Sequence, residues 1–353
     1  MKHSAFFIKA MNLHQKKTKV KLSRLKRLGV LLCMLPALAS AQEEIIVFHN
    51  CENLFYPTKD SLHADDDFTY EGKKHWTFKK YQTKLNQLAK TYISIDAKQM
   101  PSLIALAEIE NDKVLEALTK GTSLRKVGYK YIHYPSHDIR GIDVALLYDT
   151  NKFTIIESRP LTPVSQREED RTRDVLYVFG VLNTMPIHIF VVHAPSRREN
   201  NIKKDLRKKI FEDVYSHIKT LQAKGEKNFL VMGDMNDNPW DETIEQGFHT
   251  ERDLKSEISP LLYNLMQDNK DKTGSYFFNG NVLSFDQFLV SESIKERIVF
   301  SPNCNNTFIY KPSFLVKQSK RTKYDVPFST YKGMKYEGGI SDHFPIILRL
   351  KTN

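Results

Sequence analysis

Residues 228–238, with the sequence NFLVMGDMNDN, bring polar side chains directly after a short apolar run. The run at 229–232 predicts a buried strand, and Gly233 is expected to end it at a turn. If the backbone stays extended past Gly233, Asp234 and Asn236 point to the same side, over the strand end where open α/β sheets bind ligands. A carboxylate beside a carboxamide suits holding and deprotonating a water molecule near a phosphate. A plain loop is the alternative, because Asp, Asn and Gly are also the commonest turn residues.

Four other apolar runs border polar residues in the same way: 45–48 before Asn50 and Glu52, 101–107 before Glu108 and Glu110, 187–192 before His193, and 344–347 after Ser341, Asp342 and His343. A carboxylate at the end of an apolar strand is costly unless something pairs with it. Mg²⁺ is a natural partner, because it binds through one or two carboxylates, waters and substrate phosphate. Glu108 and Glu110 would share one side of their strand, so the residues alone leave both open as the ligand.

These blocks, taken in order, resemble the endonuclease/exonuclease/phosphatase family of metal-dependent phosphoesterases. The resemblance covers the chain from about Glu43 to its C-terminus and rests on five segments: HNCENLF, PSLIALAEIE, VVHAPSR, NFLVMGDMNDN and GGISDHFPII. It implies a single α/β domain with the deoxyribonuclease I-like four-layer sandwich, in which two packed mixed β-sheets are flanked by helices.

The resemblance implies a metal site built from oxygen ligands. It favours Glu108 over Glu110 as the main carboxylate, and it adds Asn50 and Asp342 as further ligands. Asp342 and Ser341 could exchange roles at this site. Mg²⁺ is the expected cofactor, with Mn²⁺ or Ca²⁺ as alternatives.

The resemblance also implies the catalytic residues. Asp234 and Asn236 would orient the attacking water, and His343, oriented by Asp286, is the candidate general base. The family leaves open whether Asp234 takes that proton instead. His193 would bind a phosphate oxygen or protonate the leaving group.

Other polar residues near these blocks are candidates for substrate binding. Arg140 holds the place of a phosphate-contacting arginine in the nuclease members, and a guanidinium matches two phosphate oxygens. Asn50 would contact the same metal-phosphate site, and Arg197 would line its rim. A surface arginine in a turn is the alternative for Arg140.

Periodicity and turn signals predict the elements between the blocks. Apolar residues recur at helical spacing over 76–95 and 202–222, so both segments are expected to form helices that cover a sheet. Two short strands are expected to pair as a hairpin around Asn279-Gly280. Residues 301–336 are polar and irregular, and they predict a variable loop on the substrate side.

Residues 1–41 predict a secretory signal peptide. A segment with nine Lys or Arg and no acid is followed by an apolar run of about ten residues and by Ala39-Ser40-Ala41. The run is too short to span a bilayer. Cleavage is expected near Ala41, whether translation begins at Met1 or Met11, and it leaves a secreted or periplasmic domain of residues 42–353.

Removing this segment changes the charge argument. The whole chain has a formal net charge of +11, but nine of its 53 basic residues lie in the leader, which leaves 44 against 42 acidic residues. A basic surface that binds nucleic acid must therefore be a local patch. The lysines on the predicted helix at 202–222 are expected to form a solvated face, and Arg171 and Arg173 are expected to balance the acids at 168–170.

The expected function is therefore Mg²⁺-assisted hydrolysis of a phosphodiester by a secreted, monomeric enzyme with weak affinity for duplex nucleic acid. A phosphatase or a phospholipid or sphingomyelin phosphodiesterase would share this site. Two other classes remain open: a catalytically inactive binding module, and a calcium-dependent surface protein built on Asp65 to Asp67. Only Cys51 and Cys304 remain outside the leader, and Cys51 is expected to be a buried thiol.

Overall fold

The computed structural model describes residues 42–59, 66–163, 171–197, 201–250, 260–267, 273–299, 308–319 and 322–352. Asp65, Cys304 and the leader lie outside these ranges. Among the described residues, no helix is long and apolar enough to cross a membrane.

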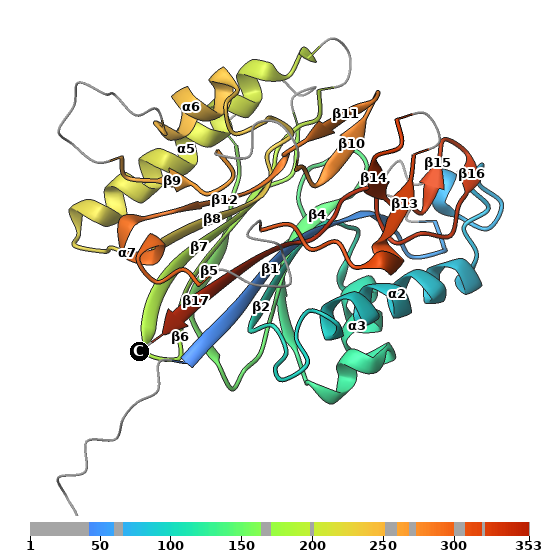
Figure 1. Ribbon diagram of the computed structural model, residues 1–353, viewed down its shortest axis with the longest axis horizontal. Helices are drawn as coiled ribbons and strands as arrows, with labels where there is room; N and C mark the ends of the chain where they lie inside the picture. The colour runs from blue at the N-terminus through green and yellow to red at the C-terminus, as the bar shows by residue number, and fades with distance from the viewer. Residues whose placement is uncertain are drawn as a thin grey trace, which may run out of the picture. The chain divides into compact units, whose positions relative to one another are not determined.

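Two mixed β-sheets form the centre of the fold (Figure 1). The first has the strand order β17 (Ile346–Thr352), β1 (Gln42–Leu54), β2 (Leu103–Ile109), β4 (Asp143–Tyr148) and β3 (Lys130–His133). The second has the order β5 (Phe153–Leu161), β6 (Val175–Leu182), β7 (Met185–His193), β8 (Phe229–Asp234), β12 (Asp286–Val290) and β9 (Tyr263–Asn264).

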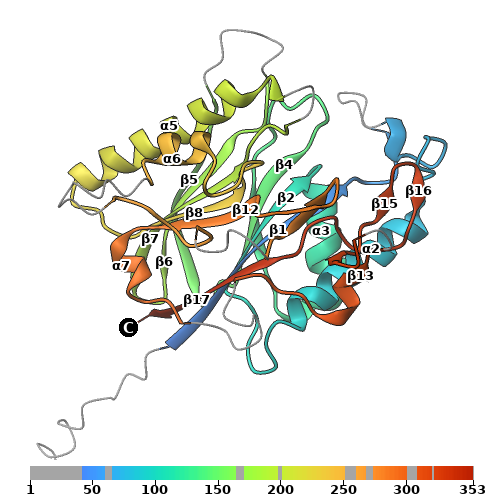
Figure 2. The ribbon, with the colours of Figure 1, turned by 45° about the horizontal axis from the view of Figure 1, so that its top comes forward.

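Helices cover the outer face of each sheet (Figure 2). The first sheet is covered by α2 (Phe78–Ile93) and α3 (Asp112–Gly121), and the second by α5 (Lys204–Ala223) and α6 (Glu242–Phe248), while the short α7 (Glu292–Lys295) follows β12. Thr77 caps α2 by accepting a hydrogen bond from the backbone N of Lys80, and Asn111 caps α3 in the same way. These caps define where the helices begin.

Apolar side chains fill the space between these layers. One buried cluster joins the facing sheets to α2 and α3, and a second lies between the other sheet and α5 and α6. Each fully buried Leu, Ile, Val or Phe contributes about 1.5–3 kcal/mol. The four-layer α/β sandwich expected from the sequence is therefore confirmed, and so are the helices predicted at 76–95 and 202–222.

Two parallel strand pairs position the site. Most neighbouring strands are antiparallel, but β1 pairs in parallel with β2, and β7 with β8. The carboxyl ends of a parallel pair lie at the same edge of a sheet. Asn50, Glu108, His193 and Asp234 stand at or near the ends of these four strands. The fold thus brings one polar residue from each strand to a common edge.

Gly233 has a different role from the one predicted. It does not end β8 at a turn, since the strand continues through Asp234. A Cβ atom on Gly233 would lie 2.0 Å from the backbone O of Val192 on the paired strand β7. A glycine is therefore required here because the backbones of β7 and β8 approach each other closely. From the sequence alone, such a glycine cannot be told from one that forms a turn.

The hairpin around Asn279-Gly280 is confirmed by β10 (Tyr276–Phe278) and β11 (Asn281–Leu283). Asn279 and Gly280 both have positive φ angles, of 50° and 91°, as a type I′ turn requires.

The prediction that 301–336 is irregular is wrong for the described part of the segment. Four short strands form two hairpins there: β13 (Val316–Gln318) with β14 (Asp325–Pro327), and β15 (Tyr331–Lys332) with β16 (Lys335–Tyr336). Strands of two or three residues are too short to show an alternating pattern in the sequence.

Candidate active site

Four residues near the shared strand ends have backbone φ angles in the left-handed region, which residues other than glycine rarely adopt. They are Glu52 (50°), Asn53 (53°), Glu108 (61°) and Asn236 (51°). Such backbone strain costs on the order of 1–3 kcal/mol per residue and persists only where the surrounding structure holds it. Its concentration at one edge of the two sheets indicates a functional site.

Glu108 occupies a bulge of β2, between Ala107 and Ile109, which pair with β4 while Glu108 does not. Its Oε2 atom accepts a hydrogen bond of 2.6 Å from the backbone N of Asn53. Its Oε1 atom lies 3.9 Å from Nε2 of His193. The bulge therefore turns the carboxylate toward the polar residues of the neighbouring sheet.

The bulge also separates Glu108 from Glu110. The carboxylate of Glu110 accepts a 2.6 Å hydrogen bond from the backbone N of Tyr56, so it fastens the segment after β1. Burial raises the pKa of Glu108, but the charges of Arg140 and His343 outweigh this effect and hold the pKa below its usual value. Glu108 is thus ionised at neutral pH.

Asp234 lies at the junction of the two sheets. Its Oδ2 atom accepts a 3.0 Å hydrogen bond from Nδ2 of Asn50, and its Oδ1 atom accepts one of 2.9 Å from the backbone N of Asn236. Oδ2 also lies 3.7 Å from Nε2 of His193 and 3.8 Å from Nε2 of His343. Burial raises the pKa of Asp234 to about 6, against the opposing effect of the His343 charge.

Asn236 reaches the site by a route other than the one predicted. The strand continues through Asp234, but the backbone does not stay extended as far as Asn236, because Asn236 is left-handed and its N–H turns back to the side chain of Asp234. Its Nδ2 atom donates a 3.0 Å hydrogen bond to the backbone O of Ala194. Asn236 therefore joins the ends of β7 and β8.

His343 and Asp286 form a buried pair, with 2.7 Å between Nδ1 and Oδ2. Asp286 begins β12 and stands opposite Asp234 in the antiparallel register of β12 and β8. Burial lowers the pKa of His343, but the carboxylates of Asp286 and Asp234 outweigh it and raise that pKa well above its usual value. Tyr276 stacks on the ring at 4.5 Å. The ring is thus oriented, and it is charged near neutral pH.

His193, unlike His343, is neutral. An Nη atom of Arg173 lies 3.1 Å from its Nε2 atom, and a guanidinium can only donate, so Nε2 is the acceptor. Burial lowers the pKa of His193 well below its usual value, and Arg173 and Arg140 lower it further. His193 is therefore neutral, with its proton on Nδ1, a buried atom that has no hydrogen-bond partner among the described residues.

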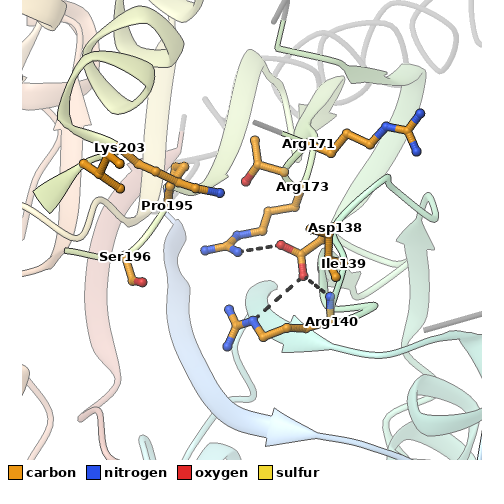
Figure 3. Close-up of a pocket in the computed structure, with 10 residues that line it drawn as sticks. Asp138, Ile139, Arg140, Arg171, Arg173, Pro195, Ser196 and Lys203 are labelled. Atoms are coloured by element: carbon orange, nitrogen blue, oxygen red, sulfur yellow. Dashed lines mark hydrogen bonds and ion pairs between the residues drawn. The ribbon is translucent and has the colours of Figure 1, made fainter. Parts of the chain in front are cut away.

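Asp138 holds two arginines beside this histidine (Figure 3). Its Oδ2 atom lies 2.8 Å from an Nη atom of Arg173, and its Oδ1 atom accepts a 3.0 Å hydrogen bond from the backbone N of Arg140. The Nε atom of Arg140 lies 3.9 Å from the same oxygen. The guanidinium of Arg140 is one-third exposed. Arg140 is therefore held next to the site while its charge remains accessible.

Arg197 contacts the loop after β8. Its Nε atom donates a 2.7 Å hydrogen bond to the backbone O of Asn236, and its guanidinium forms ion pairs with Asp237 and Asp241. The guanidinium also lies 4.9 Å from the ring centroid of Phe285. These contacts favour a role in fixing the loop after β8, and its substrate contact stays a prediction.

Ser341 links the first and last strands of their sheet. Its hydroxyl donates a 2.6 Å hydrogen bond to the backbone O of Asn50 and accepts one of 3.1 Å from the backbone N of His343. Asp342, the next residue, has a side chain that is 41% exposed and lies 4.0 Å from Nε2 of His343. Ser341 is thus engaged with backbone groups, while the carboxylate of Asp342 faces the site.

A family model described as "Endonuclease/Exonuclease/phosphatase family" matches residues 45–352. The chain belongs to this family. No curated protein matches the sequence.

Solved structures with the same fold include an endonuclease/exonuclease/phosphatase family protein from Bacteroides thetaiotaomicron, which is 16% identical, with a TM-score of 0.55 over 88% of this chain and 98% of that one. D. rerio TDP2 in complex with a single-strand DNA product is 13% identical, with a TM-score of 0.51 over 88% and 100% of the two chains. A mannosyl-6-phosphatase from B. thetaiotaomicron VPI-5482 is 14% identical, with a TM-score of 0.51 over 86% and 98%. At such identities the likeness shows the fold.

Enzymes of the endonuclease/exonuclease/phosphatase family depend on a divalent metal ion, and the residues at this edge fit one. Partial burial raises the pKa of Asp342, and the nearby Glu108 carboxylate raises it further, so the two carboxylates repel each other. A cation between them would remove that repulsion. The predicted ligands Glu108, Asp342 and Asn50 offer only oxygen atoms, as hard cations such as Mg²⁺ prefer.

The side chains of a second group of residues lie close enough together to bind a metal ion, but their chemistry suits a metal ion poorly. Ligand atoms of Asp234, Asp286 and His343 lie within 4.8 Å of one another. The Nδ1 atom of His343 is hydrogen-bonded to Asp286, and the ring is positively charged, so it repels a cation. In this family member the trio is better explained as a network that positions protons.

Two buried cations of the site were missed by sequence reasoning. Arg173 was expected to balance the acids at 168–170, which lie outside the described residues, but it contacts His193 and Asp138. The Nζ atom of Lys84, on α2, donates a 2.8 Å hydrogen bond to Oγ1 of Thr330 and also bonds the backbone O of Glu52. No periodicity marks either residue, because a buried cation is specified only by partners that are distant in sequence.

The calcium alternative gains no support from the described part of the acidic loop. Asp66 forms an ion pair with Lys59, and Asp67 forms one with Lys73, as solvated surface carboxylates do. Cys51 is buried, as predicted, and burial raises the pKa of its thiol to about 12.

Proposed function

We propose that this protein hydrolyses phosphodiester bonds with the help of a hard divalent cation. The observation that carries the proposal is the position of Asp234, whose carboxylate lies within 4 Å of Nε2 of both His193 and His343. A buried carboxylate, a neutral imidazole and an imidazolium thus surround one small region beside Glu108. A tetrahedral phosphate needs such a set, because it presents several oxygens in different directions.

Asp234 is the proposed general base. A base must be unprotonated at the working pH, and burial raises the pKa of Asp234 to about 6, which keeps it ionised yet basic near neutral pH. His343 was the first candidate from the sequence, but Asp286 and Asp234 outweigh the effect of burial and raise its pKa well above the usual value. An imidazolium cannot accept a proton, so the charges of the two groups favour Asp234 as the base.

The hydrolytic step follows from these assignments. A water molecule beside Asp234 attacks phosphorus, and one of its protons passes to the carboxylate. The bond from phosphorus to the leaving oxygen breaks on the opposite side. The His343 imidazolium, held by Asp286, donates to a nonbridging oxygen, where negative charge increases in the transition state. His193 stays a neutral imidazole beside this region, with its Nε2 atom held by Arg173.

A metal ion would be held by Glu108 and Asp342, with the side-chain oxygen of Asn50 as a further ligand. When bound, it would neutralise charge on the phosphate and stabilise the leaving oxygen. Arg140 supplies a positive charge on the other side, which its exposed guanidinium can bring to a phosphate oxygen. Mg²⁺ is the proposed ion, with Mn²⁺ or Ca²⁺ as alternatives.

A phosphodiester is proposed over a phosphomonoester because the cavity lined by Arg140 and Arg173 leaves room beside the site for a second substituent on phosphorus. Of the structures with this fold, one is bound to a DNA product and another is a mannosyl-6-phosphatase, so the fold alone leaves both classes open. The deciding experiment compares kcat/KM for bis(p-nitrophenyl) phosphate and p-nitrophenyl phosphate. A preference for the monoester would establish a phosphatase instead.

We also propose that the enzyme is exported, on the basis of the leader at 1–41. The first strand, β1, begins at Gln42, directly after the predicted cleavage site. Cleavage there would leave the described fold intact. Mass analysis of the protein from its native compartment tests this proposal, and an N-terminus that still contains the basic leader would contradict it.

A further inference from the structure

A small cavity opens beside the catalytic residues, next to the start of α5 (Figure 3). It has a volume of about 190 Å³ and is lined by Asp138, Ile139, Arg140, Arg171, Thr172, Arg173, Pro195, Ser196, Ile202 and Lys203. Complete sites for drug-sized ligands enclose roughly 300–1,000 Å³. This cavity is therefore the size of a subsite for one part of a larger ligand.

Positive charge dominates the lining. Four of the ten residues are Lys or Arg, and one is acidic. That acid, Asp138, is engaged by Arg173 and by the backbone of Arg140. In Figure 3 the guanidinium groups of Arg140 and Arg173 and the ammonium group of Lys203 point into the same space, next to the hydroxyl of Ser196. Three cationic groups around one space, with a hydroxyl donor, are suited to an anion with several oxygens.

Two apolar side chains frame the opening. Ile139 is 60% exposed and Ile202 is 73% exposed, and both line the cavity. Exposed isoleucines at the edge of a cationic cavity offer an apolar surface to the part of a ligand that carries the anion. A sugar and base attached to a phosphate have this combination of charged and apolar parts.

The cavity is continuous with the catalytic residues. Arg173 lines it and contacts Nε2 of His193 at 3.1 Å, and Pro195 and Ser196 follow His193 in the chain by two and three residues. Arg140 lines it too, and its charge is the strongest influence that lowers the pKa of Glu108. A ligand in the cavity would therefore touch a residue, Arg173, that also contacts His193.

We propose that this cavity binds a second phosphate, with its attached nucleoside, of a single-stranded nucleic acid whose neighbouring phosphodiester is being hydrolysed. Lys203 is the specificity-determining residue, because its ammonium group points into the cavity and has no role in the proposed hydrolytic step. This inference rests on the proposed function and narrows its substrate class. Substrates with a single phosphate cannot use the cavity and should react more slowly than oligonucleotides.

The test compares Lys203→Met, which keeps the apolar stem, with the parent protein. Binding of a fluorescein-labelled thymidine tetranucleotide is followed by anisotropy with Mg²⁺ in an Asp234→Asn background, where cleavage is slow. We expect Kd to rise by about tenfold or more, since a hydrogen bond to a charged group contributes about 1.5–3 kcal/mol. The slope of log Kd against log salt concentration should fall by about 0.7 for one lost phosphate contact.

Two controls separate this effect from a general loss of charge. Lys209→Met removes a lysine of the same helix that is paired with Asp213, and it should leave Kd unchanged. Lys203→Arg retains the charge and should keep most of the affinity. An unchanged Kd in Lys203→Met, an equal loss in Lys209→Met, or undetectable binding by the parent protein would overturn the subsite.

Turnover distinguishes failure of the subsite from failure of the proposed function. In the wild-type background, Lys203→Met should lower kcat/KM for the tetranucleotide by about tenfold relative to bis(p-nitrophenyl) phosphate, for the same lost charged contact. If the wild-type protein hydrolyses neither substrate, the proposed function fails, and the anisotropy result still decides whether the cavity binds phosphate.

Discussion

The Nδ1 atom of His343 lies 2.7 Å from Oδ2 of Asp286, although the two residues are 57 positions apart in the chain. Asp286 stands opposite Asp234 in the antiparallel pairing of β12 and β8, and His343 directly precedes the last strand of the other sheet. The pair therefore connects the two halves of the sandwich at the candidate active site. Its effect is to keep a charged imidazole beside the carboxylate of Asp234.

Replacement of Asp286 by Asn tests this pair. The Asp286 carboxylate is one of the groups that raise the pKa of His343, so its removal lowers that pKa and the imidazolium is lost at a lower pH. We expect the alkaline limb of the kcat/KM profile to move to lower pH, and kcat at pH 8 to fall by about 10²-fold. An alkaline limb that stays in place would show that His343 acts without its charge.

The acid limb of the same profile reports on Asp234. Its pKa is raised by burial to about 6 in the folded protein, and only the ionised carboxylate can accept a proton from water. Activity should therefore rise as pH increases through about 6 and level off above it. A profile that is flat between pH 5 and 7 would exclude a base with this pKa.

The metal requirement can be assigned to one of two neighbouring glutamates. EDTA should abolish hydrolysis and added Mg²⁺ should restore it, because all of the proposed ligands are oxygen atoms. Glu108→Gln should raise the Mg²⁺ concentration for half-maximal activity by at least about tenfold, as expected for the loss of a charged ligand. Glu110→Gln is the matched control and should leave that concentration unchanged, since Glu110 bonds the backbone of Tyr56. Equal effects of the two variants would refute the assignment.

The close approach of β7 and β8 gives a prediction about stability. In Gly233→Ala the new Cβ would lie 2.0 Å from the backbone O of Val192, so the two strands would have to separate. We expect the free energy of unfolding, measured by urea denaturation, to fall by about 1–3 kcal/mol. Gly121→Ala, where a Cβ would meet no atom within 4 Å, is the control and should change it little. A Gly233→Ala protein as stable as wild type would show that the strands can adjust.

The apolar runs predicted the buried strands well, because a strand that is covered on both faces must be apolar along its length. The same runs located Asn50, Glu108, His193 and Asp234, since each lies where such a run ends. The structure brings these four side chains together, and it brings His343 and Asp286 to them. Their chemical roles remain predictions for the experiments above.

Sequence patterns could not locate groups that depend on tertiary contacts. The sequence around Arg173 predicts a surface charge. In the structure the side chain is buried between Asp138 and His193, which belong to other strands and loops. The sequence predicts Arg197 at the rim of the site, but it does not predict the ion pairs that Arg197 forms with two aspartates of the loop after β8. In both cases the partner is distant along the chain, and side-chain type alone does not distinguish the two environments.

The most direct test of the account is hydrolysis of bis(p-nitrophenyl) phosphate with Mg²⁺ by the wild-type protein and by Asp234→Asn, with thermal unfolding followed in parallel. We predict that wild type turns over the diester and that kcat falls by at least about 10²-fold in Asp234→Asn, because an amide cannot accept the proton of water. Tm should be unchanged or higher, since an ionised carboxylate is no longer buried. Turnover by Asp234→Asn at the wild-type rate, or no diester hydrolysis by either protein, would contradict the assignment of Asp234 as the base of a phosphodiesterase.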